Sequence, residues 1–533
     1  MKEEILNVIK QKGLLLEKDI FDVLNSIEDV GLAKIFLENL EKFSGQKVIT
    51  KAVLSKNFEF LQSVVKNLPG ESKASVEKVF VKMGLQFEMS REQAVVANLE
   101  ERIPDGIKYQ IFYAETKPDK KLEVSDFTGN FVSRYQQLQR LLMNRADLTN
   151  LISINKISNE RQSISIIGMV SEKRITKNKN MIIKVEDLTG QINVLVKSSK
   201  EELFAKAQEL QIDEVVGIKA SGSREILFGQ EIIFPDAFVA NKVKFDKEIC
   251  VAFLSDVHVG SQKHLGTEFE RFLEWLNSDD ETAHKIKFIF FLGDNVDGVG
   301  IFPGQESLLS LKSMKEQYFL LAEYLKRIPP HITMFMCPGQ HDATRVAEPQ
   351  PIIDKKYAPS LFDIPNLVLV TNPSMVKLIE GTKELKVLMY HGASMHSFIN
   401  EIPELREIKA HRFPAKVAKH LLKRRHLAPT HSSVVYIPNS DRDPLVIKDV
   451  PDIMCTGDLH RLDIETYNGI LIVSGSCWQS QTDFEEKVGN IPDPGKVPVL
   501  NLKTRELKIF DFMTPKKEEL ELNEIKMEIK NEN

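Results

Sequence analysis

The spacing of apolar and polar residues changes twice along this chain of 533 residues. Over residues 1–68 the apolar positions recur at helical spacing. From Ser163 to Pro235 the spacing is that of short strands, and from Lys247 to Phe512 apolar runs alternate with helical stretches. This pattern predicts a multidomain protein with an N-terminal α-helical module, a β domain and an α/β domain, in that order.

The β domain has the pattern of an OB-type barrel. Five strand-like segments lie between residues 163 and 235, and a helical insert precedes the fourth. A helix with Leu138, Leu141 and Leu142 on one face comes before the first segment. We therefore place an OB-type β-barrel domain with its leading helix at residues 126–240.

The remaining segments carry no candidate for chemistry. Residues 1–68 form the helical module, which serves either docking or simple core packing. Residues 69–125 are charged and contain Pro104 and Pro118, which predicts a linker with some local structure. Residues 514–533 are a charged tail, expected to be a solvated helix or disordered.

The α/β domain, at residues 247–513, contains five apolar runs that each end in polar residues able to bind metal. In chain order these residues are Asp256 and His258, Asp294, Gln340 with His341 and Asp342, His391, and Asp458 with His460. Ligands bind at the carboxyl ends of strands in open α/β sheets. A single motif of this kind is more often an ordinary loop, but five in order predict a dinuclear metal site that hydrolyses phosphate esters.

Composition limits the remaining possibilities. The net charge is −5 and the pI about 6.2, so the chain has no general basic field, and any nucleic-acid contact must come from local patches or a partner. One local candidate is the basic stretch from Lys173 to Lys179, which either follows a phosphate backbone or is an ordinary solvated turn. The cysteines have no CxxC spacing, and no apolar run is long enough to span a bilayer, so we expect a soluble cytoplasmic protein with reduced core cysteines.

The five strand-end motifs resemble those of the calcineurin-like metallophosphoesterases, whose pattern is D-x-H, G-D, G-N-H-[DE], H and G-H-x-H. Longer segments are similar to the small subunit of the archaeal D-family DNA polymerases. These segments are residues 340–351, 424–430, 436–444 and 478–484. The order of helical start, OB-type barrel and layered α/β phosphoesterase domain, a β-sandwich flanked by helices, is also similar, so the resemblance covers nearly the whole chain.

The resemblance implies a 3′→5′ exonuclease that proofreads DNA for a large polymerase subunit, which itself carries out polymerisation. It also implies two divalent metal ions, with manganese expected and magnesium as the alternative. The first ion would be held by Asp256, His258, Asp294 and His460. The second would share Asp294 and be completed by Gln340, His391 and Asp458.

The resemblance further assigns roles to three residues after the third strand. His341 would act beside the metal ions, where it stabilises the phosphoryl transition state or protonates the leaving 3′ oxygen. Asp342 is expected to orient the imidazole of His341. Arg345 is expected to contact the substrate phosphate, with a purely structural role as the alternative.

Two ligands depart from the superfamily pattern, and both belong to the second metal ion. Gln340 stands at the position of an asparagine, and Asp458 at that of a histidine. One hypothesis is that the second site survives with more oxygen ligands and favours manganese or magnesium. The rival is that the site is weakened and the chain serves as a scaffold for polymerase assembly. A free-standing phosphoesterase for small substrates is disfavoured, because such an enzyme needs neither the barrel nor the helical module.

Overall fold

The computed structural model describes Ile9 and residues 15–17, 48–49, 106–116, 121–488, 490–514 and 525–527. The chain divides into two compact units, Met1–Gln93 and Ala94–Asn533. In the first unit, β1 (Leu15–Leu16) pairs in parallel with β2 (Val48–Ile49). Most of the predicted helical module, most of the predicted linker and much of the charged tail lie outside the described residues.

The second unit contains a seven-stranded mixed sheet that carries three of the five strand ends. Its order is β12-β11-β10-β9-β18-β19-β20, with parallel pairing from β12 to β9 and antiparallel pairing beyond. The strands are β9 (Cys250–Leu254), β10 (Ile286–Leu292), β11 (Thr333–Cys337), β12 (Leu367–Leu369), β18 (Lys496–Asn501), β19 (Leu507–Asp511) and β20 (Ile525–Met527). The last of these falls within the predicted charged tail, yet it pairs with β19.

A six-stranded mixed sheet carries the other two strand ends. Its order is β16-β17-β15-β14-β13-β3. The strands are β3 (Lys108–Tyr113), β13 (Ser374–Glu380), β14 (Lys383–Met389), β15 (Ile453–Thr456), β16 (Asp463–Tyr467) and β17 (Ile470–Ser474).

Strand β3 corrects the predicted linker, which was placed at residues 69–125. It pairs antiparallel with β13 over its full length and buries Ile111 against the core. The segment is rich in aromatic and β-branched residues, which favour strands, but flanking charges obscured this signal. The α/β domain therefore recruits a strand from far outside the predicted range of 247–513.

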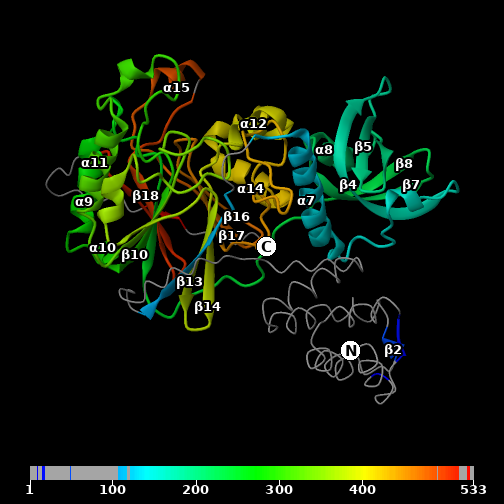
Figure 1. Ribbon diagram of the computed structural model, residues 1–533, viewed down its shortest axis with the longest axis horizontal. Helices are drawn as coiled ribbons and strands as arrows, with labels where there is room; N and C mark the ends of the chain where they lie inside the picture. The colour runs from blue at the N-terminus through cyan, green and yellow to red at the C-terminus, as the bar shows by residue number, and fades with distance from the viewer. Residues whose placement is uncertain are drawn as a thin grey trace. The chain divides into compact units, whose positions relative to one another are not determined.

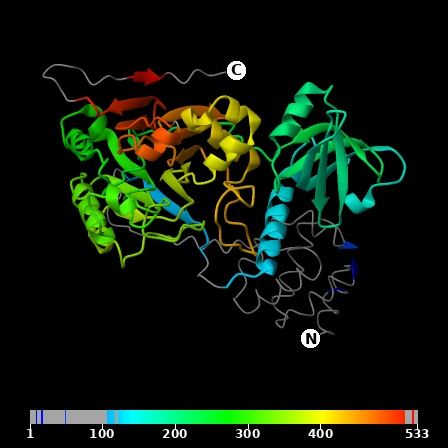
Figure 2. The same ribbon diagram turned by 90° about the horizontal axis from the view of Figure 1, so that it is seen from above.

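The two sheets face each other across an apolar core, and helices cover their outer faces. Stacked rings of Phe253, Phe290 and Phe335 lie in the layer between the sheets. Two groups of helices lie on opposite sides of the pair of sheets (Figures 1 and 2). They are α9 (Gly266–Leu276), α10 (Glu281–Lys285) and α11 (Met314–Leu325) on the seven-stranded sheet, and α12 (Met395–Glu401), α13 (Pro403–Glu407) and α14 (Pro414–Arg424) on the six-stranded sheet. The predicted multidomain α/β architecture is confirmed.

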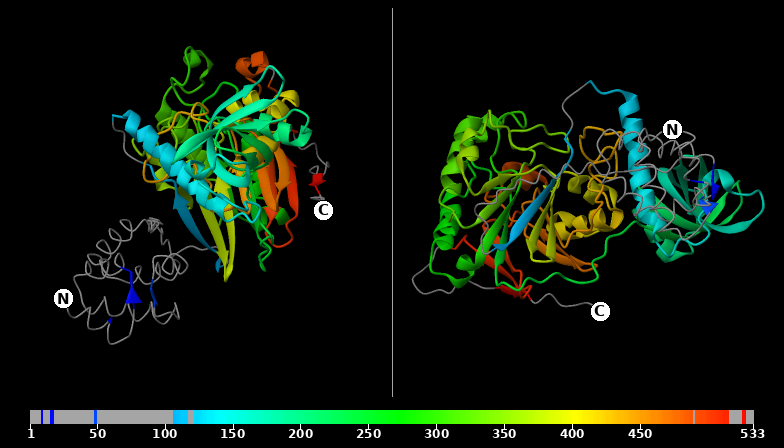
Figure 3. Two further views of the ribbon diagram at one scale, coloured as in Figure 1. Left: turned by 90° about the vertical axis from the view of Figure 1, so that its right-hand side faces the viewer. Right: turned by 60° about the horizontal axis from the view of Figure 1, so that its bottom comes forward.

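A closed five-stranded barrel precedes the sandwich. Its strands follow the order β4-β5-β6-β8-β7, and a helix lies between the third and the fourth strand in sequence. The helix α7 packs against β4 and β7 (Figure 3), as its leucine-rich face predicts. The elements are α7 (Val124–Met143), β4 (Gln162–Ile175), β5 (Met181–Asp187), β6 (Gly190–Val196), α8 (Glu201–Glu209), β7 (Val215–Gly222) and β8 (Leu227–Ile233).

Buried ion pairs join the barrel to the sandwich. Arg424, at the end of α14, pairs with Glu214 and also lies 3.2 Å from Oε1 of Glu209. Arg134 of α7 donates from Nε to Oδ2 of Asp443 at 2.7 Å. These charges are largely buried, so each depends on its partner for stabilisation.

Two predictions from composition can be checked in the described residues. All four cysteines are buried and free, as expected for reduced core residues. No helix in the described part of the chain is long and apolar enough to cross a membrane.

Candidate metal centre

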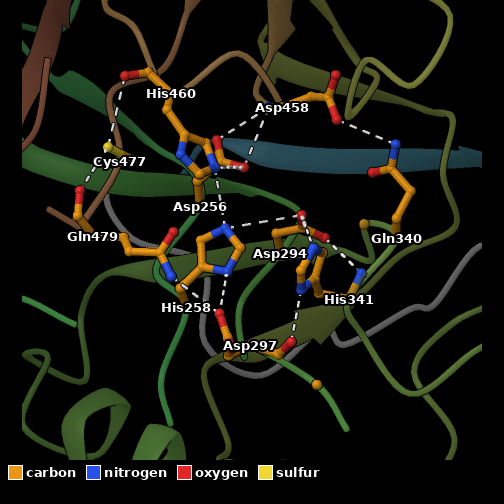
Figure 4. Close-up of polar contacts among 12 residues, drawn as sticks. Asp256, His258, Asp294, Asp297, Gln340, His341, Asp458, His460, Cys477 and Gln479 are labelled. Atoms are coloured by element: carbon orange, nitrogen blue, oxygen red, sulfur yellow. Dashed lines mark hydrogen bonds and ion pairs between the residues drawn. The ribbon is translucent and has the colours of Figure 1, made fainter. Parts of the chain in front are cut away.

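The five strand ends meet at one edge of the sandwich and bring all seven predicted metal ligands together. Figure 4 labels these ligands except His391. Asp256 and His258 follow β9, Asp294 follows β10 and Gln340 follows β11. From the other sheet, His391 follows β14, and Asp458 and His460 follow β15. The prediction that residues after these strands share one site is therefore supported by their geometry.

The loops that carry the ligands have unusual backbone conformations. Five ligands have φ between 48° and 70°, a region that non-glycine residues rarely adopt: Asp256, His258, Asp294, Asp458 and His460. Such strain is typical of functional sites. Glycine is also required at position 339, because a Cβ there would lie 2.2 Å from Oδ1 of Asp294 and 2.7 Å from Nε2 of His391.

The first candidate site joins Asp256, His258 and His460, whose ligand atoms all lie within 4.8 Å of one another. Nδ1 of His258 donates to Asp297 at 3.0 Å, and Nδ1 of His460 donates to Glu485 at 3.1 Å. A charged carboxylate only accepts hydrogen bonds, so each imidazole has its hydrogen on Nδ1 and a lone pair on Nε2. These two Nε2 atoms face each other at 3.1 Å.

Two facing lone pairs repel each other unless a cation lies between them. A proton can fill that role, and a divalent ion bound by both imidazoles and Asp256 can do so as well. Carboxylate partners on the remote nitrogen are usual for metal-binding histidines. The donor set of the first site therefore fits a metal ion.

The surrounding charges favour positive charge at this centre. Burial lowers the pKa of His460, but the carboxylates of Glu485 and Asp256 outweigh burial and raise it to about 9. Burial likewise opposes the charge on His391, yet Asp294 holds the pKa of this imidazole well above its usual range. The carboxylates thus favour a cation at this centre, either a proton or a divalent ion.

The second candidate site contains Gln340, His391 and Asp458. Each leaves a buried atom without a hydrogen-bond partner among the described residues: Oε1 of Gln340, Nε2 of His391 and Oδ2 of Asp458. Unpartnered buried polar atoms are costly, and an ion bound by all three would satisfy them. The residues therefore fit a second ion with an oxygen-rich ligand set.

Contacts within the second site keep these atoms available. Nδ1 of His391 donates to the carbonyl oxygen of Leu292 at 2.7 Å, which directs Nε2, the atom that can take a proton or an ion, into the centre. That Nε2 lies 3.3 Å from Oδ2 of Asp294, the expected bridging ligand. Nε2 of Gln340 donates to Oδ1 of Asp458 at 3.1 Å, which leaves Oε1 of the amide free.

His341 lies beside both sites. Its backbone N–H donates to Oδ1 of Asp294 at 2.8 Å, and its Nδ1 donates to the carbonyl oxygen of Asp297 at 2.6 Å. Nε2 lies 3.9 Å from Oδ2 of Asp294, and the side chain is 21% exposed. The free edge of the imidazole can therefore reach a substrate bound at the centre.

Asp342 does not orient His341, contrary to the sequence prediction. Its Oδ2 accepts hydrogen bonds from the backbone of Gly339 and from the backbone and side chain of Asn295. Its Oδ1 accepts from the hydroxyl of Tyr318 at 2.8 Å. These buried donors draw the carboxylate away from the imidazole, so Asp342 holds the loop that carries His341 rather than the ring itself.

Comparison with known proteins places the chain in a family. A family model for the B subunit of the DNA polymerases alpha and epsilon matches residues 251–463. The DNA polymerase II small subunit of Methanothermobacter thermautotrophicus is 37% identical over 385 residues, covering 71% of this chain and 78% of that protein. The chain belongs to the archaeal DNA polymerase II small subunits. This confirms the resemblance to the D-family small subunit.

Other DNA polymerase II small subunits are similarly related. The protein of Archaeoglobus fulgidus is 37% identical over 382 residues, covering 70% of this chain and 75% of that protein. The protein of Pyrococcus furiosus is 35% identical over 401 residues, covering 73% of this chain but 64% of that protein. The match thus spans somewhat less than two thirds of the Pyrococcus furiosus sequence.

Two of the solved structures that match this chain are only distantly similar to it. An archaeal phosphodiesterase aligns with 49% of this chain and 98% of its own at 11% identity and a TM-score of 0.25. Zinc-bound Vps29 of Entamoeba histolytica aligns with 49% of this chain and 91% of its own at 15% identity and a TM-score of 0.24. Scores of this size do not establish a shared fold.

Two carboxylates of the candidate centre were not predicted from the sequence. Asp297 lies three residues after Asp294, so its place in the same strand-end loop was a usable signal. It binds His258 through its side chain and His341 through its carbonyl. Glu485, near the start of α15 (Asp483–Val488), carried no such signal, because the fold alone brings it to His460.

Two basic candidates are bound within the protein itself. Arg345 donates from Nε to the carbonyl of Ala347 and from Nη2 to that of Pro349, which supports the structural alternative for this residue. Lys173, the first residue of the basic stretch, donates from Nζ to the carbonyl of Gln208 at 2.9 Å. Lys177 and Lys179 in the same turn are exposed.

Proposed function

We propose that this chain is the small subunit of a replicative D-family DNA polymerase and carries a metal-dependent 3′→5′ exonuclease that removes mispaired nucleotides. A large partner subunit would carry out polymerisation. The observation that carries the proposal is the 3.1 Å approach of the Nε2 atoms of His258 and His460, each with a carboxylate on its other nitrogen. A chain that only scaffolds an assembly has no physical need for this arrangement.

The proposed cofactors are two divalent ions, manganese or magnesium. Asp256, His258, Asp294 and His460 would hold the first, and Asp294, Gln340, His391 and Asp458 the second. When bound, two such ions supply an activated water and positive charge for the phosphoryl oxygens. The amide and carboxylate oxygens of the second site favour hard ions such as manganese and magnesium.

The residues of the chain supply the rest of the chemistry. The carbonyl of Asp297 accepts the Nδ1 hydrogen of His341 and so fixes the orientation of the ring. In its protonated form, His341 presents Nε2–H towards the centre, where it can donate to a phosphoryl oxygen or protonate the leaving 3′ oxygen. Asp342 serves this step indirectly, because it holds the loop after β11.

Two features support DNA rather than a small molecule as the substrate. The chain belongs to a family of polymerase subunits. The closed barrel has five strands and a helix before the fourth, which supports an OB-type assignment, a fold that often binds nucleic acid. Lys177 and Lys179 project from its β4–β5 turn and would contact the phosphate backbone.

The test is digestion of a 5′-labelled primer with a mispaired 3′ nucleotide, in Mn²⁺ or Mg²⁺, by the chain alone and together with the large subunit. We expect products shortened one nucleotide at a time from the 3′ end and complete loss of cleavage with a chelator. Internal cuts, or cleavage of a small phosphodiester but not of DNA, would contradict the proposal.

The second candidate is a catalytically weak scaffold, favoured by one observation. The amide of Gln340 is bonded to Asp458, so two ligands of the second ion already satisfy each other in part. If neither the chain nor its complex cleaves the primer with either metal, the scaffold is the better account.

A further inference from the structure

We propose that His396 is a positioning residue for the second metal ion, acting through Asp458. This inference rests on the proposed two-ion centre. His396 lies in the first turn of α12, on an element that contributes none of the seven predicted ligands. Its Nε2 lies 3.3 Å from Oδ2 of Asp458.

Asp458 needs such a partner because its carboxylate is otherwise held on one side only. Oδ1 accepts a hydrogen bond from Gln340 at 3.1 Å. On the other side, Oδ2 faces Nε2 of His396 at 3.3 Å, an ion-pair contact. Together, Gln340 and His396 fix the plane of the carboxylate while one lone pair on Oδ2 stays available for an ion.

The local charge makes this contact significant. Asp458 shares the centre with the carboxylates of Asp256 and Asp294, and its own backbone N–H donates to Asp256. The neighbouring carboxylates repel that of Asp458, and a positive or donating group at each of its oxygens opposes this repulsion. His396 provides that group from the side opposite Gln340, so we infer that it pre-orients Asp458 for the ion.

His396 can be replaced without disturbing the core. Its side chain is half exposed, whereas α12 is anchored by the buried side chains of Met395, Phe398 and Ile399. The ring of His411 lies 5.6 Å from that of His396 and provides a matched control, because no described contact joins His411 to Asp458.

The test is calorimetric titration of the whole chain with Mn²⁺. The unmodified protein should bind two ions in two resolvable steps. His396→Ala should weaken the second step about 10- to 100-fold and leave the first unchanged, as loss of a partner of a metal ligand commonly does. His396→Gln should retain most of the affinity, because its amide N–H can replace Nε2–H, and His411→Ala should leave both steps unchanged.

Each other outcome has a distinct meaning. Two steps that are both unaffected by His396→Ala would overturn the role of His396. A second step weakened equally by His411→Ala would also overturn it, because the effect would not depend on the contact with Asp458. A single step in the unmodified protein would overturn the two-ion centre and this inference together. Two steps without nuclease activity would overturn the proposed function and leave the role of His396 intact.

Discussion

At the scale of single residues, the centre depends on carboxylates that are not expected to bind the ions themselves but that accept hydrogen bonds from the imidazole ligands. Asp297 is the clearest case, because its side chain binds His258 and its backbone carbonyl binds His341. Gln479 and Gln305 donate to the same carboxylate and hold it in place. One aspartate therefore positions a metal ligand and the expected catalytic histidine at once.

Replacing the Asp297 side chain should separate these two functions. Asp297→Ala removes the acceptor for Nδ1 of His258 but keeps the carbonyl that orients His341. We expect the affinity of the first ion to fall about 10- to 100-fold, measured by Mn²⁺ titration, while activity recovers at saturating Mn²⁺. Asp279→Ala, at an exposed position, is the control. Activity that stays low at saturating metal would contradict this division of roles.

A second residue-scale prediction concerns Glu348, which is buried beside Tyr390, the residue before His391. Burial raises the pKa of Glu348 to about 8, although a hydrogen bond from Tyr390 opposes this effect. A carboxyl whose pKa is raised in the folded state costs nothing below its unfolded value of about 4.5. The cost grows as the pH rises towards 8 and reaches about 4 kcal/mol there.

Glu348→Gln should therefore change the pH dependence of stability. The variant should gain thermal stability relative to the unmodified protein as the pH rises from 5 to 8, with little difference at pH 5. Melting temperatures measured across this range provide the check. A constant difference across this pH range would show that the pKa of Glu348 is not raised in the folded protein.

At the scale of elements, the sequence predicts features within single segments, such as a strand and the loop after it, and misses contacts between segments that are distant in sequence. The five strand ends were found because each pairs an apolar run with a polar loop, and the structure brings their residues together. Asp342 was misassigned, because sequence adjacency to His341 does not reveal that Asn295 and Tyr318 hold its carboxylate. Glu485 and His396 were missed, because only tertiary packing brings them to the ligands.

The junction between barrel and sandwich gives a prediction at this scale. Arg424→Ala would leave Glu214 buried without its cation, which typically costs about 3–5 kcal/mol. We expect a large drop in the denaturation midpoint, followed by urea titration. Lys285→Ala, which breaks exposed pairs with Glu248 and Glu281, should lower the midpoint much less. Equal losses in the two variants would contradict the importance of the buried pair.

At the scale of the whole molecule, the α/β sandwich is a frame that holds the side chains of the candidate centre on the loops after its strands. Both sheets contribute strand ends to one edge, and a helix of the outer layer adds a partner to that edge. The barrel and α7 precede this frame and are joined to it by buried charges. This arrangement suits a protein that binds a DNA end while a partner synthesises the strand, as we propose.

The most direct test of the central claim compares the unmodified protein with His341→Ala, each in complex with the large subunit, on a mispaired 3′ end in Mn²⁺. His341 is not an expected ligand, so both proteins should bind the same number of ions with similar affinity. The account predicts that His341→Ala lowers the rate of 3′→5′ cleavage about 10²- to 10⁴-fold. Cleavage by His341→Ala at the unmodified rate, or none by the unmodified protein with its metals bound, would contradict it.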